Sequence, residues 1–287
     1  MNRIISYIRI CRIPQWYKNL VIFLPMLFVS GLILKDQILL VVLGFVALSL
    51  VSSSNYIIND IIDLKKDRHH PEKKTRPLAA GKITVFESWV LAILLAAGSF
   101  YLAYRLNLYF FYSVLLLFAL TQIYSLFLKN EVFLDILLIS TNFVIRAASG
   151  AFILGVVISP WLILCTFFLA MFLSVSKRYA DLLYLGKSAT KHKQVLAHYS
   201  KELTNVLMII STVLLIMSYS LYSFLSTHRY LLVTLPIALY VIFRYFYLVY
   251  SGSEISRHPD KMIKDSRLML GGLILLAALI LLLHFVK

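Results

Sequence analysis

Nine stretches of mostly apolar residues fill most of this 287-residue chain. They lie at residues 19–34, 38–58, 84–104, 108–128, 132–156, 160–176, 203–225, 230–250 and 268–286, the first and sixth being short. A membrane-spanning helix needs about 20 such residues. Composition agrees, because 61% of the residues are hydrophobic and only 14% are charged, whereas a soluble domain carries about 25% charged residues. The sequence predicts one all-α, polytopic membrane domain over residues 1–287, with nine transmembrane helices.

Basic residues are in excess, and their positions indicate what they contact. The chain has 28 Lys and Arg against 13 Asp and Glu, a net charge of +15, which is compatible with nucleic acid or with an anionic membrane surface. Most of the 28 fall on one side of the predicted spans, in segments that include 1–18, 59–83 and 177–202. Cytoplasmic loops hold such an excess. We therefore expect a plasma-membrane protein whose N-terminus and two longest loops are cytoplasmic, with no nucleic-acid partner.

The first 18 residues differ from the spans that follow. Isoleucines alternate with Arg3, Arg9 and Arg12, and Trp16 and Tyr17 come next. A basic, amphipathic segment followed by aromatic residues is typical of a helix lying at the membrane surface. Residues 1–18 are therefore predicted to be an interfacial segment.

The end of the second span carries a row of polar side chains. Asn55, Asn59, Asp63 and Asp67 follow one another at four-residue spacing, and Asp60 lies beside them. On a continuous helix all five share one face. Aspartates gathered in this way repel one another unless a cation lies between them, and Mg²⁺ commonly bridges carboxylates and substrate phosphates. The alternative is a solvated helix end whose acids pair with neighbouring Lys and Arg.

The loop at 59–83 continues with a second phosphate-binding signal. Arg76 can donate two hydrogen bonds to phosphate oxygens, and Gly81 permits a tight turn back into the third span. We expect Arg76, together with Asn55 and Arg68, to contact the substrate, while Asp60, Asp63 and Asp67 bind Mg²⁺ and Asn59 completes the shell.

These motifs resemble those of a known family. The pattern Asn59-Asp60-x-x-Asp63-x-x-x-Asp67, followed by Arg76-Pro-Leu-x-x-Gly81 in a nine-span chain, is similar to the UbiA superfamily of intramembrane prenyltransferases. The resemblance covers essentially the whole chain. It implies helices around a central cavity that opens sideways to lipid, with Mg²⁺ holding a prenyl diphosphate at two aspartate-rich motifs.

The second aspartate-rich motif of that family is missing here. The chain reads Ser176-Lys177-Arg178-Tyr179-Ala180-Asp181-Leu182, with Leu185 where a second aspartate is expected. One carboxylate beside two cations suits a donor with more negative charge, such as phosphoribosyl diphosphate with its additional 5-phosphate. The chain looks like the decaprenyl-phosphate phosphoribosyltransferase branch of the superfamily. Further similarities to that branch are Pro14-Gln15-Trp16-x-Lys18-Asn19, Asp67-Arg68-x-His70-Pro71, Ile145-Arg146-Ala147 and Asp265-x-Arg267.

That resemblance implies a reaction in cell-envelope lipid-linked sugar synthesis. The enzyme would transfer a 5-phosphoribosyl group from phosphoribosyl diphosphate to a polyprenyl phosphate, with Mg²⁺ neutralising the diphosphate that leaves. Lys177, Arg178 and Tyr179 would hold the 5-phosphate or orient the ribose. Asp181 would bind a ribose hydroxyl or a second Mg²⁺. The sequence leaves the lipid's chain length open, and also whether protomers form an oligomer.

Other basic residues have two interpretations each. Arg146, deep within the fifth span, binds the lipid phosphate or the donor, or pairs with Asp135 or another buried acid. Lys18 receives the lipid phosphate or is an ordinary interfacial anchor. Asp265 and Arg267 form an ion pair or take part directly in catalysis.

Two other functions remain as alternatives. A prenyltransferase acting on an aromatic or other acceptor would be expected to keep the second aspartate-rich motif. A transporter would explain the intramembrane Arg146, but it would leave the aspartates on the second span without a role.

Overall fold

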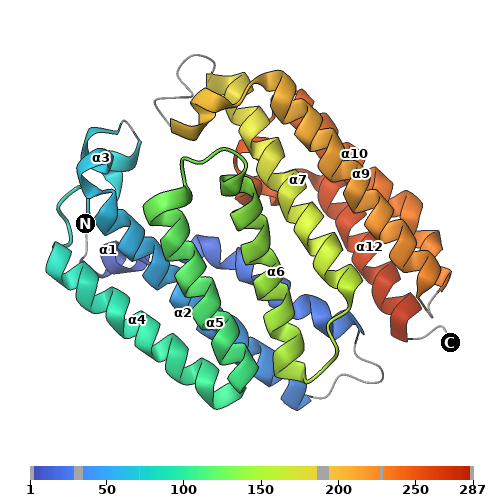
Figure 1. The fold of residues 1–287 in the computed structure, drawn as a ribbon, viewed down its shortest axis with the longest axis horizontal. Helices are drawn as coiled ribbons and strands as arrows, with labels where there is room; N and C mark the ends of the chain where they lie inside the picture. The colour runs from blue at the N-terminus through green and yellow to red at the C-terminus, as the bar shows by residue number, and fades with distance from the viewer. Residues whose placement is uncertain (1–2, 29–34, 71, 186–193, 227–228, 285–287) are drawn as a thin grey trace. The chain divides into compact units, whose positions relative to one another are not determined.

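A computed structural model describes residues 3–28, 35–70, 72–185, 194–226 and 229–284. Within these ranges all the regular structure is helical (Figure 1). The chain divides into two compact units. The first comprises residues 1–24, 34–129 and 145–156, and the second comprises 25–33, 130–144 and 157–287. The all-α prediction is therefore confirmed.

The first unit begins with a short α-helix and a 3₁₀ helix, and its long helices follow. α1 spans Arg3–Ile10 and exposes Ile4, Ile5 and Ile8 while burying Ser6 and Ile10. The 3₁₀ helix η1 spans Ile13–Phe28. Exposed isoleucines beside arginines are what an interfacial helix requires, so α1 is compatible with the predicted surface location of residues 3–10.

η1 is joined to the next helix by side-chain hydrogen bonds. The Trp16 indole N–H donates to the Ser53 hydroxyl at 3.0 Å, and the Asn19 amide donates to the Ser49 hydroxyl at 3.1 Å. Both serines are fully buried on α2, which spans Lys35–Ile62. Buried polar groups are costly unless they are hydrogen-bonded. These pairs therefore fix the position of η1 along α2.

The remaining helices of the first unit follow in order. They are α3 (Leu64–His69), the 3₁₀ turn η2 (Lys73–Thr75), α4 (Val85–Leu106), α5 (Leu108–Ile123) and the π-helical turn η3 (Tyr124–Leu128). α4 starts at a capping box formed by Thr84 and Glu87, and Asn107 caps α5. Such caps supply partners for the orphan N–H groups of a helix start. α4 packs along α2 (Figure 1). Arg76, in the segment that joins α3 to α4, contacts Asp60 near the end of α2.

α6 (Leu134–Leu154) contributes residues 134–144 to the second unit and residues 145–154 to the first. The second unit continues with α7 (Pro160–Leu185), η5 (Gln194–His198), α9 (Lys201–Leu225), η6 (Arg229–Thr234), α10 (Leu235–Tyr250), α11 (Glu254–Arg257), η7 (Pro259–Lys264) and α12 (Ser266–His284). Its core includes Phe172, Met208, Tyr245 and Leu248. α7 packs against α9, and α10 against α12.

Eight helices in the described parts of the chain are long and apolar enough to cross a membrane. Each coincides with one of the predicted spans. The remaining prediction, 19–34, falls partly on η1 and partly on residues 29–34, which lie outside the described residues. The number nine therefore remains a prediction, as does the length of the first span.

Two predicted loops are more helical than expected. α7 continues to Leu185 instead of ending at residue 176, so the Lys177–Asp181 motif lies on the helix. In the loop predicted at 59–83, α2 reaches Ile62 and α3 follows almost at once. Residue 71 of the first loop and residues 186–193 of the second lie outside the described part of the chain.

A close approach of η1 to α6 gives a stability prediction. A Cβ atom on Gly150 of α6 would overlap the backbone carbonyl of Ile22, which is fully buried. We expect Gly150→Ala to destabilise the fold by about 1–3 kcal/mol, because backbone atoms cannot move aside as a flexible side chain can. Gly272→Ala is the control, since a Cβ there meets no atom within 4 Å. Thermal unfolding in detergent would measure both, and equal midpoints would contradict this packing.

Candidate active site

The predicted aspartates are divided between two helices by a break at Asp63. α2 ends at Ile62, Asp63 has φ −86° and ψ 3°, and α3 begins at Leu64. Helical backbone hydrogen bonds nevertheless continue through the break, from the Asp63 N–H to Asn59 at 2.9 Å and from the Asp67 N–H to Asp63 at 2.8 Å, so the shared polar face stays a prediction. Asp63 and Asp67 have different partners, Lys129 and Arg76.

Arg76 joins the first and last of the three aspartates. Its Nη1 lies 2.9 Å from Oδ1 of Asp60 and 2.6 Å from Oδ2 of Asp67. Lys73 adds a more distant cation, with its Nζ 3.8 Å from Asp67. Asp60 and Asp67 are both buried, and buried carboxylates need a compensating cation. The sequence predicted Arg76 as a phosphate-binding residue, and the structure brings it to the aspartates.

Asp60 also accepts a hydrogen bond from Arg12, on the same Oδ1 atom that accepts from Arg76. The Arg12 guanidinium lies 4.9 Å from the centre of the Tyr56 ring. Tyr56 precedes Asp60 by one turn of α2. Arg12 has a positive φ of 50° between α1 and η1, a conformation that is uncommon for residues other than glycine. Sequence reasoning treated Arg12 only as an interfacial charge, since nothing distinguished it from Arg3 and Arg9.

Asp63 has a partner of its own. Lys129, directly after η3, places its Nζ 2.7 Å from Oδ1 of Asp63. Lys129 lies 66 residues further along the chain, so no local sequence signal connects it to Asp63. Asn55 contacts α5, where it accepts a hydrogen bond from Gln122 at 2.6 Å.

The other predicted residues on this side differ in exposure. Asn59 is half-buried on α2, whereas Arg68 is exposed on α3. Arg146 donates from Nε to Oδ1 of Asn19 at 2.8 Å. Lys18 is half-buried, and both Lys18 and Arg146 interact electrostatically with Tyr56. All of these residues belong to the first unit.

The oxygen atoms around Arg76 suit a hard cation. Among the described residues, no three His, Cys, Asp or Glu side chains lie close enough to hold a metal ion on their own. Mg²⁺ does not need such a cage, because one or two carboxylates plus substrate phosphates and water commonly complete its shell. Asp60 and Asp67, which meet at one guanidinium nitrogen, supply two such carboxylates. The residues therefore fit a magnesium–phosphate site of this kind.

In the second unit, Arg178 lies in a buried cluster. Its Nη2 is 3.1 Å from Oδ2 of Asp135, and the Tyr199 hydroxyl donates to Oδ1 of Asp135 at 2.9 Å. The same hydroxyl accepts from the Phe133 backbone N–H at 2.9 Å. Burial raises the pKa of the Tyr199 phenol, so the phenol stays protonated and can donate. The Arg178 guanidinium is therefore enclosed with a carboxylate, and its predicted contact with the substrate stays a prediction. Asp135 was expected as an alternative partner of Arg146.

The neighbours of Arg178 on α7 are more accessible. Lys177 and Tyr179 are half-buried, and the Tyr179 ring lies 5.4 Å from that of Tyr250. Asp181 accepts from Nε of Arg257 at 3.1 Å. Arg257, which the sequence analysis assigned only to a basic segment, is therefore a second residue that it missed.

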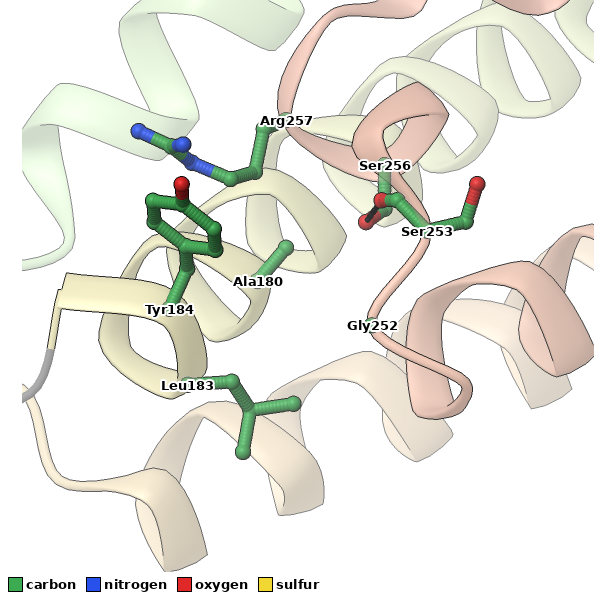
Figure 2. Close-up of a pocket in the computed structure, with 7 residues that line it drawn as sticks. All are labelled: Ala180, Leu183, Tyr184, Gly252, Ser253, Ser256 and Arg257. Atoms are coloured by element: carbon green, nitrogen blue, oxygen red, sulfur yellow. Dashed lines mark hydrogen bonds between the residues drawn. The ribbon is translucent and has the colours of Figure 1, made fainter.

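Arg257 also borders a small pocket (Figure 2). Its guanidinium lies 4.1 Å from the centre of the Tyr184 ring. The pocket is formed by the end of α7, by the turn that leads into α11 and by α11 itself. Its lining residues are Ala180, Leu183, Tyr184, Gly252, Ser253, Ser256 and Arg257.

The pair expected between Asp265 and Arg267 has a different geometry. Arg244 of α10 donates to Asp265 from Nε at 3.2 Å and from Nη2 at 2.6 Å. The hydrogen bond from Arg244 is the main cause of a lowered Asp265 pKa, with smaller contributions from the Leu268 N–H and from the charge of Arg267. No sequence motif singles out Arg244 for this contact. The two-pronged contact joins α10 to the start of α12.

The comparisons with known proteins define the class to which this fold and these motifs belong. Residues 20–262 match the model of the UbiA prenyltransferase family. The chain belongs to the UbiA prenyltransferase family, and it is a multi-pass membrane protein.

Individual relatives give finer detail. The chain is 30% identical to a decaprenyl-phosphate phosphoribosyltransferase of Mycolicibacterium smegmatis, over 78% of this chain and 71% of the relative. It is also 30% identical to a protein of that name from Corynebacterium glutamicum, over 77% and 68% of the two chains. A UbiA homologue from Archaeoglobus fulgidus bound to GPP and Mg²⁺ has the same fold, with a TM-score of 0.74, 19% identity and 96% coverage of both chains.

Proposed function

We propose that this protein transfers a 5-phosphoribosyl group from phosphoribosyl diphosphate to a polyprenyl phosphate and releases diphosphate. The observation that carries the proposal is the similarity to the mycobacterial and corynebacterial phosphoribosyltransferases over more than three quarters of this chain. The α7 motif supports it, since Lys177 and Tyr179 precede a single aspartate, Asp181, where a prenyltransferase has several.

The proposed reaction is a substitution at the anomeric carbon of ribose. An oxygen of the lipid phosphate forms a bond to that carbon as the bond to the diphosphate oxygen breaks. The diphosphate leaves with the bonding electrons, and the ribosyl carbon carries positive charge in between. The lipid phosphate is already anionic at neutral pH, so the chemistry requires no general base. The main task of the protein is to stabilise negative charge on the leaving group.

Residues of the first unit suit that task. Asp60 and Asp67 would hold Mg²⁺, with Asp63 and Asn59 completing the site, and the bound ion would neutralise charge on the departing diphosphate. Arg76 adjoins both Asp60 and Asp67, and its remaining N–H groups can donate to phosphate oxygens. Lys129 places a second positive charge beside Asp63.

The sequence of the α7 motif assigns it to the rest of the donor. Lys177 and Tyr179 would bind the 5-phosphate, and Asp181 would accept from a ribose hydroxyl. Arg178 would act as a positioning residue, since its buried ion pair fixes the turn of α7 from which Lys177 and Tyr179 project. Both sets of residues would lie on the cytoplasmic side, which the charge asymmetry of the loops favours and where a soluble donor is available.

Metal removal is the direct test of this proposal. Purified protein in detergent, given a polyprenyl phosphate and ribose-labelled phosphoribosyl diphosphate, should move label into the organic phase when Mg²⁺ is present. EDTA should reduce the transfer to background, and added Mg²⁺ should restore it. No transfer at any lipid length, together with Mg²⁺-dependent transfer from a prenyl diphosphate to an aromatic acceptor, would reject the proposal in favour of prenyl transfer.

A further inference from the structure

Three cationic side chains meet around one tyrosine in the first unit. Arg12 stacks over the Tyr56 ring at 4.9 Å, and Lys18 and Arg146 both interact electrostatically with the Tyr56 hydroxyl. They come from three separate segments: the turn after α1, the helix η1 and the second half of α6. Lys18 was predicted as an interfacial residue and Arg146 as an intramembrane one. The structure makes them neighbours of a common group.

Arg146 is held in this place by a neutral partner. Asn19, which is buried, accepts from Arg146 at 2.8 Å and donates to Ser49 at 3.1 Å. An amide can orient a guanidinium without neutralising it. Gly150, one turn further along α6, allows the close approach to η1 that brings Arg146 to Asn19. The positive charge of Arg146 is thus built into the packing of η1 against α6.

Charge considerations indicate what such a site binds. Arg12 is paired with Asp60, but Lys18 and Arg146 bring further positive charge to Tyr56, and a cation at membrane depth is costly unless it serves a cavity or an anion. A phosphate monoester carries about −1.5 to −2 charges at neutral pH and has three strong acceptor oxygens. We propose that Arg12, Lys18 and Arg146, with the Tyr56 hydroxyl, form the subsite for the phosphate of the acceptor lipid. This inference rests on the proposed function.

The position of Tyr56 on α2 supports the assignment to the acceptor rather than the donor. Tyr56 precedes Asp60 by one helical turn, about 5.4 Å along the axis, and Arg12 contacts both residues. Tyr56 also lies further from the end of α2, and therefore deeper in the span, than Asp60. A phosphate that arrives on a membrane-embedded chain would meet Tyr56 first. The diphosphate of a soluble donor would meet Asp60 and Asp67, and reacting groups one turn apart suit direct attack.

Binding measurements without turnover test this subsite. Geranylgeranyl phosphate and the matching alcohol, geranylgeraniol, would be titrated into the detergent-solubilised protein in the absence of donor. We expect the phosphate to bind at least about tenfold more tightly than the alcohol. Arg146→Gln and Lys18→Gln should each remove most of that preference. Arg105→Gln, which changes an exposed arginine at the end of α4, should leave it intact.

Steady-state kinetics then separate the two substrates. Lys18→Gln and Tyr56→Phe should raise the acceptor KM by about tenfold or less while leaving the donor KM unchanged. A rise confined to the donor KM would overturn the assignment, as would equal binding of phosphate and alcohol by the parent protein. If no transfer is found but the phosphate preference depends on Arg146, the subsite stands and the proposed donor fails. Should Arg146→Gln not fold, the conservative Arg146→Lys, together with Lys18→Gln, carries the test.

Discussion

Replacing Asp60 with asparagine should lower the rate of the Mg²⁺-dependent transfer by about 1,000-fold, or about 4 kcal/mol of transition-state stabilisation. Asp60 accepts from both Arg12 and Arg76 through one oxygen and is buried beside Asp67. The amide keeps the shape of the side chain but removes the charge that would hold the metal ion. The half-saturating Mg²⁺ concentration should also rise. Initial rates across a Mg²⁺ series would measure both effects.

The matched control for Asp60→Asn is Asp36→Asn, at the exposed first turn of the same helix. It makes the same chemical change about 24 residues away, and we expect its rate to match that of the parent protein. Thermal unfolding of the two variants would show whether Asp60→Asn lowers the rate by losing the fold. A folded Asp60→Asn protein with unchanged rate and unchanged Mg²⁺ dependence would remove Asp60 from the proposed metal site.

The transmembrane pattern was readable from sequence because it depends on local composition. Each of the eight helical spans contains a long, mostly apolar stretch, and a membrane allows such a stretch only as a helix. The first predicted span was harder to predict. It contains Pro25, and the structure has the 3₁₀ helix η1 there instead of an α-helix. Boundaries next to polar motifs were also difficult, since α7 continues as a helix through Lys177 and Arg178.

The candidate site was predictable only where its residues lie close in sequence. The spacing of Asp60, Asp63 and Asp67 was visible, as was the possible role of Arg76 nine residues after Asp67. Arg12 and Lys129 contact these aspartates from 48 and 66 residues away. Nothing in a single sequence shows which distant cation a carboxylate will choose. The same limit explains why Arg244 was not expected to hold Asp265.

Arg178 illustrates a different difficulty. A basic residue beside a lysine and a tyrosine in a loop motif suggests substrate binding, and only three-dimensional packing shows that its charge is already matched. Asp135 is fully buried and lies 43 residues earlier in the chain. Whether an arginine binds a substrate or another residue depends on such contacts, which composition and spacing do not contain.

Asp135→Asn should destabilise the protein by about 3–5 kcal/mol, because it leaves the Arg178 charge buried without its counter-ion. The side chains of Asp135 and Arg178 expose only 0% and 7% of their surface, so water cannot replace the lost partner. Tyr199→Phe should cost less, about 1–3 kcal/mol, since it leaves one acceptor on Asp135 and the Phe133 N–H without a partner. Thermal and denaturant unfolding in detergent would measure these losses.

The double variant Asp135→Leu with Arg178→Met separates charge burial from packing. Replacing both ions with apolar groups of similar volume is often neutral or stabilising. We therefore expect the double variant to be more stable than Asp135→Leu alone or Arg178→Met alone. Asp265→Asn is the matched control, because Asp265 pairs with Arg244 where both side chains keep partial exposure, 11% and 19%. It should cost about 1 kcal/mol or less. Additive losses in the double variant would mean that the two residues stabilise the fold independently.

The same double variant tests whether Arg178 only positions its neighbours. If it folds and the donor KM rises while a further change at Lys177 still lowers the rate, then Arg178 acts through the geometry of α7. A parent-like donor KM would show that α7 keeps its shape without the ion pair, and the positioning role would be withdrawn. A different outcome is possible in a folded Asp135→Asn background. If that variant recognises the 5-phosphate with arginine at position 178 but not with lysine there, the Arg178 guanidinium reaches the donor directly.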